Sequence, residues 1–133
     1  MNSSTAATLK HLAAAGDMTA KALVEGVKDI LLTAGVEAVN VIKVSGRIVD
    51  GVGNPKPGVQ NILAVSKPVS GVGTMTDGGA GTIIAGSASV SVWMQTDATG
   101  AFQLDVLNAV AEVNLVQVTT DNGDVAQIVL TFA

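Results

Sequence analysis

Apolar and polar residues alternate along several short segments from residue 41 onward. In the segment 41–50, Ile42, Val44 and Ile48 take one set of positions, and mostly polar residues take the positions between them. A period of two is typical of a β-strand with one buried face. Later segments repeat the pattern and predict further inward-facing side chains: Val90, Val92 and Met94, then Phe102, Leu104 and Val106, and finally Ile128, Leu130 and Phe132.

Turn-forming residues separate these segments. The stretch DGVGNPKPG (50–58) is dense in glycine and proline and predicts a turn or loop. The stretch TDATG (96–100) joins two strongly alternating segments, where Asp97 can cap the turn and Gly100 can adopt a positive φ. In DNGD (121–124), the Asn-Gly pair is the strongest hairpin signal in the chain. The pattern therefore predicts a mainly β, antiparallel fold.

Two regions depart from this alternation. Residues 66–87 are rich in glycine, serine and threonine, and we expect a long loop with a short strand at Ile83-Ile84. Residues 19–34 show helical spacing instead, and Gly35 is a natural helix stop. We therefore expect an amphipathic helix over 19–34 and divide the chain into an N-terminal helical segment (1–40) and a β domain (41–133).

The apolar stripe of the expected helix needs a partner. It comprises Leu23, Val27, Ile30, Leu31 and Ala34. The first four of these are candidate interface residues, because the helix can bundle with copies from other chains. The alternative is that the stripe docks on the chain's own β domain.

Composition and charge exclude several classes of function. The formal net charge is −4 and basic residues are scattered, which argues against nucleic-acid binding. The chain has no cysteine, and its one histidine, His11, makes a zinc site within one chain improbable. No apolar run is long enough to span a membrane, and the N-terminus lacks the features of a secretory signal peptide.

The residues that could form a metal, phosphate-binding or catalytic site are better explained as ordinary turn or surface residues. Asp97, Asp105, Asp121 and Asp124 invite a calcium site, but their spacing favours ordinary turn chemistry. The glycine-rich runs GVGNPKPG and GVGTMTDGGAGT lack the Gly-Lys-Ser/Thr of a phosphate-binding loop. His11 lies far in sequence from every acidic turn. We therefore expect no enzyme activity, no cofactor and no metal.

Trp93 is the residue that most suggests a binding surface. Its strand places it on the polar face beside Ser91 and Gln95, opposite Val92 and Met94. A tryptophan on such a face is often an interface anchor. The alternative is that the N-terminal helix or the long loop covers it within the same chain.

The order of motifs from about residue 42 onward resembles bacterial immunoglobulin-like domains of the invasin and intimin type. The matching residues are VSGRIVDGVGNPKPGV, SASVSVWMQTDATGAFQLDV and NGDVAQIVLTFA. The resemblance implies an Ig-like antiparallel β-sandwich preceded by the helical segment, and it carries no catalytic residues. Carboxypeptidase-regulatory-like and transthyretin-like sandwiches share a similar order of features, so the motifs favour a fold more than a subfamily.

The same resemblance suggests a function. Such modules occur in surface adhesins and in tailed-phage virion proteins, and the missing signal peptide favours the virion. We expect a capsid decoration or head-fibre protein, assembled in the host cytoplasm, that binds the major capsid protein or another virion protein. It would self-associate, with a trimer favoured. The alternatives are an adhesion module that binds a carbohydrate or receptor, and a tail tube or tail fibre component.

Overall fold

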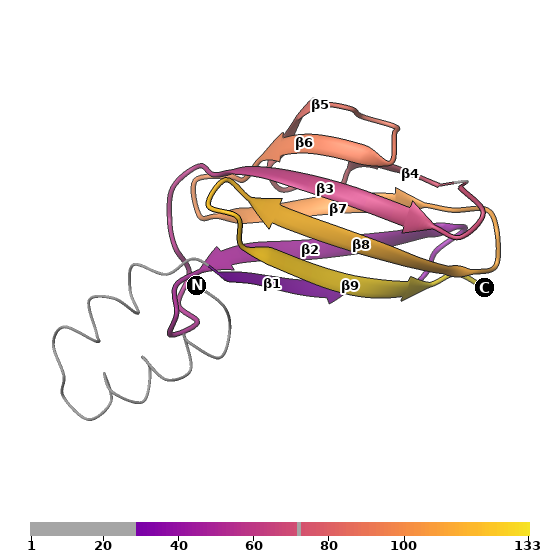
Figure 1. Cartoon of the computed structure of the whole chain (residues 1–133), viewed down its shortest axis with the longest axis horizontal. Coiled ribbons are helices and arrows are strands. Elements are labelled where there is room, and N and C mark those ends of the chain that lie inside the picture. The colour runs from indigo at the N-terminus through magenta and orange to yellow at the C-terminus, as the bar shows by residue number, and fades with distance from the viewer. Residues whose placement is uncertain (1–28, 72) are drawn as a thin grey trace, which may run out of the picture.

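The computed structural model describes residues 29–71 and 73–133, which form two antiparallel β-sheets packed face to face (Figure 1). Sheet A has the order β1-β2-β7-β4, and sheet B has the order β5-β6-β3-β8-β9. The strands are β1 (Asp29–Ala34), β2 (Val41–Val49), β3 (Asn61–Pro68), β4 (Thr74–Asp77), β5 (Thr82–Ala85), β6 (Ser91–Gln95), β7 (Ala101–Leu107), β8 (Val113–Thr120) and β9 (Val125–Thr131). The predicted antiparallel β-sandwich is confirmed.

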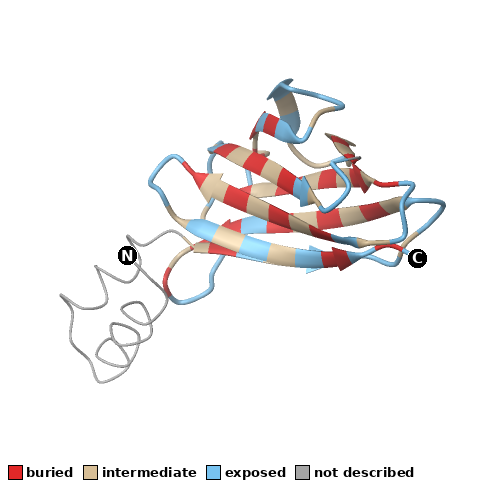
Figure 2. Cartoon of the chain, turned by 45° about the vertical axis from the view of Figure 1, so that its right-hand side comes forward, coloured by how far each residue is buried: buried red, intermediate tan, exposed pale blue. Residues whose placement is uncertain are grey.

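The alternating side chains fill the space between the sheets. Figure 2 shows buried and less buried residues alternating along the long strands. The inward-facing residues predicted within β2, β6 and β7 are buried, as are Leu130 and Phe132, and Ile128 packs against the core. Val90 is the exception: it precedes β6 and is exposed, while its carbonyl accepts a hydrogen bond from Ser66 N–H (2.8 Å). The register predicted for β6 is therefore correct from Ser91 onward.

In the core, the ring of Phe102 packs directly against the backbone of Gly46. Gly46 of β2 lies opposite Phe102 of β7 in the register of sheet A. A Cβ atom at Gly46 would lie 2.1 Å from Cζ of Phe102, so the ring fills the space that a side chain would need. A glycine inside a strand often marks such a close approach.

The turn predictions are also confirmed. At the corner 96–100, Asp97 Oδ1 accepts hydrogen bonds from Thr99 N–H (2.8 Å) and Ala101 N–H (3.1 Å), and Gly100 has a φ of 82°. At the β8–β9 hairpin, Gly123 N–H donates to the Thr120 carbonyl (3.0 Å) with a φ of 85°. Residues 66–87 contain two short strands, β4 and β5, instead of the single one predicted.

The predicted helix over 19–34 is wrong for residues 29–34. These residues form β1, an edge strand that pairs with β2 and places Ile30 opposite Ile48 and Leu31 opposite Arg47. The short apolar sequence DILLTA fits helical spacing, but it also places Ile30 and Leu32 on one face of a strand. Burial of Ile30 and Leu32 against sheet B selects the strand. The sandwich therefore includes residues that the sequence analysis assigned to the N-terminal segment.

This strand separates the candidate interface residues. Ile30 is only 6% exposed and belongs to the core, so it offers no side chain to another molecule. Leu31 is 52% exposed on the outer face of sheet A. Leu23 and Val27 lie outside the described residues, as does the rest of the predicted helix.

We predict that Gly46→Ala lowers the free energy of unfolding by about 1–3 kcal/mol, the usual cost of overpacking a core, because Phe102 must move. Gly35→Ala is the matched control, since a Cβ there makes only an ordinary contact, 3.6 Å from the Lys43 carbonyl oxygen. Urea denaturation of both variants measures the difference. Equal losses in the two variants would contradict the close packing at Gly46.

Asp substitutions at adjacent residues distinguish the strand from the predicted helix. Ile30→Asp should lower the free energy of unfolding by at least about 2–5 kcal/mol, the cost of truncating a buried isoleucine, with a further cost for burying the carboxylate. Leu31→Asp should change it by less than about 1 kcal/mol, because the side chain is half exposed. If both variants unfold with the wild-type midpoint, residues 29–34 are not a strand of this core.

Candidate functional site

The outer face of sheet A is polar and charged. Lys43 of β2 lies opposite Asp105 of β7, and its Nζ is 3.2 Å from Asp105 Oδ1. The same ammonium group donates a hydrogen bond to the Gly78 carbonyl. The Lys43 ammonium group thus has two partners on this face.

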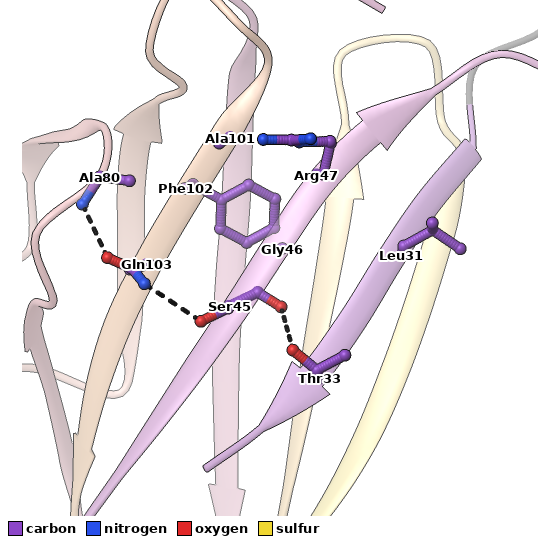
Figure 3. Close-up of a pocket in the computed structure, with 9 residues that line it drawn as sticks. All are labelled: Leu31, Thr33, Ser45, Gly46, Arg47, Ala80, Ala101, Phe102 and Gln103. Carbon is purple, nitrogen blue, oxygen red and sulfur yellow. Dashed lines mark hydrogen bonds between the residues drawn. The ribbon is translucent and has the colours of Figure 1, made fainter. Parts of the chain in front are cut away.

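A shallow groove of about 400 Å³ lies on this face, next to the ion pair (Figure 3). Three hydrogen bonds join polar groups of the groove: Ala80 N–H donates to Gln103 Oε1 (3.2 Å), Gln103 Nε2 donates to Ser45 Oγ (3.3 Å), and the Thr33 hydroxyl donates to the Ser45 carbonyl (3.5 Å). Among the lining residues that the structure describes, Arg47 is the charged one, and none is a carboxylate, histidine or cysteine. The groove therefore brings together no acid–base pair or activated nucleophile.

The outer face of sheet B has the opposite character. Its outward-facing positions hold apolar and neutral polar side chains, and Lys67 is the one charged residue among those that the structure describes on the strands. Lys67 Nζ interacts with Gln117 Oε1 at 3.4 Å. When another surface covers a sheet face with so little charge, few charged groups lose their contact with water, so the free-energy cost of desolvation is small.

The strand register gathers apolar residues from distant parts of the chain on this face. One row crosses all five strands of sheet B: Ala85, Trp93, Leu63, Thr119 and Val125. A parallel row aligns Leu115 with Val129. We call the set Leu63, Val65, Trp93, Leu115, Val125 and Val129 the B face. Trp93, Val125 and Val129 of this set are exposed, and the other three are partly buried. Polar residues of the same face lie between them, namely Thr119 and the hydrogen-bonded pair Gln117 and Gln127.

Trp93 is the most prominent side chain of the B face. Its side chain is 50% exposed, so the segment 66–87, which forms β4 and β5, leaves half of it accessible. It lies beside Leu63, its register partner on the neighbouring strand β3. A large aromatic group held rigidly by its strand loses little conformational freedom on binding, which is why tryptophan is enriched at interface centres.

The sequence analysis identified Trp93 but missed the rest of the B face. Val125 is 52% exposed and Val129 is 60% exposed, and both lie on β9, far from Trp93 in sequence. A signal was present, because residues 113–120 and 125–133 contain no charged residue. Only the pairing of β3 with both β6 and β8 shows that these segments share a face with Trp93.

The structure places the turn aspartates apart. Across residues 29–71 and 73–133, no three histidine, cysteine, aspartate or glutamate side chains lie close enough to hold a metal ion. Asp97 caps its own corner, and its hydrogen bonds, that from the Thr99 hydroxyl above all, hold the pKa of its carboxyl below the ordinary value. Asp105 pairs with Lys43. His11 lies outside the described residues.

The described part of the chain also contains no helix that is long and apolar enough to cross a membrane.

Comparisons with known proteins support the fold alone. No protein-family model matches the chain, and no curated protein matches it. Among solved structures, a β-glucuronidase of Parabacteroides merdae is similar over 77% of this chain, with 14% identity and a TM-score of 0.54. The adhesin InvE of Yersinia pseudotuberculosis is similar over 80%, with 14% identity and a TM-score of 0.50. This chain spans 12% and 32% of their respective lengths. The described part of the chain thus has an Ig-like β-sandwich fold.

Proposed function

We propose that this chain is a non-enzymatic structural protein of a phage virion, a capsid decoration or head-fibre protein that docks through the B face. The observation that carries the proposal is the nearly uncharged outer face of sheet B, with Trp93 half exposed on it. Depletion of charge and enrichment in aromatic residues characterise the centres of protein interfaces.

The size of the B face favours a protein that acts in many copies. Strands lie about 4.8 Å apart and rise about 3.4 Å per residue, so the face measures roughly 20 Å by 20 Å, or roughly 400 Å². A standard interface buries about 800 Å² on each partner. One B face alone would therefore bind weakly, and stable attachment would need several linked copies, since linkage greatly raises the overall affinity.

The phage setting is supported by the sequence motifs. The stretches around the 50–58 turn, the 96–100 corner and the β8–β9 hairpin resemble immunoglobulin-like modules that recur in tailed-phage virion proteins. The confirmed sandwich is consistent with a module of that type. The difference between a charged outer face on sheet A and a nearly uncharged one on sheet B suits a protein with one side against a shell and one side in water.

The exposed indole of Trp93 favours a second candidate function, adhesion through a carbohydrate ligand. An aromatic ring on a flat sheet face can stack against a sugar ring, and one structure with a similar fold is an adhesin. In this alternative the B face would bind a glycan on a cell surface.

Particle purification from the organism that carries this sequence tests the proposal. Phage particles are induced, separated on a density gradient and probed for the chain, expressed as the wild type, as Trp93→Ser or as the control Val69→Ser, which alters an exposed valine outside the B face. We expect the wild type and the control to be found with the particles. Trp93→Ser should lower occupancy at least tenfold, because removing an interface anchor costs about 2 kcal/mol or more.

Two results would contradict the proposal. The chain could be recovered only from the cell envelope, with binding to glycans that Trp93→Ser abolishes, which would favour adhesion. Alternatively, Trp93→Ser and Val69→Ser could occupy particles as fully as the wild type, which would exclude the B face as the docking surface.

A further inference from the structure

The edges of the two sheets differ in how well they are protected against pairing with another strand. In the described part of the chain, sheet A ends at β1 and β4, and sheet B ends at β5 and β9. Natural sheets protect their edges with short strands, bulges and charged residues. β4 and β5 have four residues each, β4 ends in Asp77, β5 contains a bulge between Ile83 and Ala85, and β1 begins with Asp29.

β9 has none of these protective features. It is seven residues long, pairs regularly with β8 over its whole length and has the sequence VAQIVLT, without charge or proline. An uncharged, regular edge strand of this length is a template for a further strand.

The backbone of β9 presents its unpaired groups at regular intervals. Phe132 N–H donates to the Glu112 carbonyl (2.9 Å) and Thr120 N–H donates to the Asp124 carbonyl (2.9 Å), so the even-numbered residues direct their backbone groups toward β8. In an antiparallel pair this direction alternates. The backbone groups that face the open edge therefore belong to the odd-numbered residues Val125, Gln127, Val129 and Thr131.

Among residues 29–71 and 73–133, the elements next to β9 leave this edge open. β1 of sheet A lies beside β9, but its backbone pairs with β2. Glu37 Oε2 accepts a hydrogen bond from Ala133 N–H (2.8 Å), which is the next edge-facing group beyond the strand. The edge available for pairing therefore corresponds to β9 itself, Val125–Thr131.

We infer that β9 pairs antiparallel with β9 of a second copy of this chain, about a two-fold axis at Ile128. This register uses the whole open edge and brings only edge-facing groups together: Val125 lies opposite Thr131 of the partner subunit, and Gln127 lies opposite Val129 of the partner subunit. Such a contact is self-complementary, as a two-fold interface requires. No like charges meet across this contact, because β9 has no charged residue.

The pairing also enlarges the surface that is proposed to dock. The two sheets B become one continuous sheet, and the two B faces lie side by side on it. Their combined area is roughly 800 Å², which reaches the standard size for one side of an interface. This part of the inference rests on the proposed function, whereas the pairing itself can be measured on the isolated full-length chain.

Analytical ultracentrifugation of the full chain over a range of concentrations tests the pairing. The wild type should be a dimer in equilibrium with monomer. Gln127→Lys/Val129→Lys places lysines directly opposite one another and should weaken dimerisation at least about tenfold, since juxtaposed like charges cost several kcal/mol. Gln127→Glu/Val129→Lys places opposite charges together in the same register and should restore the dimer. Val36→Lys, at an exposed residue outside β9, is the control and should leave the dimer unchanged.

Circular dichroism and urea midpoints confirm that each variant is folded, and the Glu/Lys variant shows that β9 tolerates two charges. A wild-type chain that stays monomeric overturns the inference. So does an oligomer, including a trimer, that persists in the Lys/Lys variant, because its contacts must then lie elsewhere in the chain. A dimer that is sensitive to these variants but absent from phage particles supports the pairing and contradicts the proposed function, so the two failures can be told apart.

Discussion

The fold depends on the close packing of Phe102 against Gly46. The core is built from small and medium aliphatic side chains, and the ring of Phe102 is the largest side chain that is completely buried within it. The ring has room only because Gly46, opposite it in the register, has no side chain. Because successive side chains of a strand face opposite sides, this pairing disfavours a one-residue slip of β2 against β7, which would exchange the inner and outer residues of the strand that slips.

Once the inner faces are defined, the outer faces follow, and they differ sharply. Sheet A turns Lys43, Arg47 and Asp105 toward solvent, whereas sheet B turns Trp93 and a group of valines and leucines outward. Apolar side chains on both faces of a sheet are costly in a free monomer, since only one face can be buried within the chain. A second surface that covers sheet B is the simplest explanation of this arrangement, and the docking proposal follows from it. The edge-pairing proposal rests instead on the unprotected edge of β9.

Local patterns predicted most of the fold but little of the surface. The alternation in β2 and β7, the corner at Asp97 and the turn at Gly123 depend on residues close in sequence, and each was predicted. β1 was missed because the apolar run at Ile30 fits two periods, and β4 was missed because four residues give no clear period. The B face and the Gly46–Phe102 contact depend on which strands are neighbours, and local sequence patterns do not show this.

The most direct test of the account is covalent footprinting of exposed side chains, comparing the free chain with the chain in the assembly isolated from its host. The account predicts that labelling of Trp93, Val125 and Val129 falls on assembly, while labelling of Leu31 in the sheet A groove stays the same. Protection of Leu31 with full labelling of Trp93 would contradict the account, because the functional surface would then lie on sheet A.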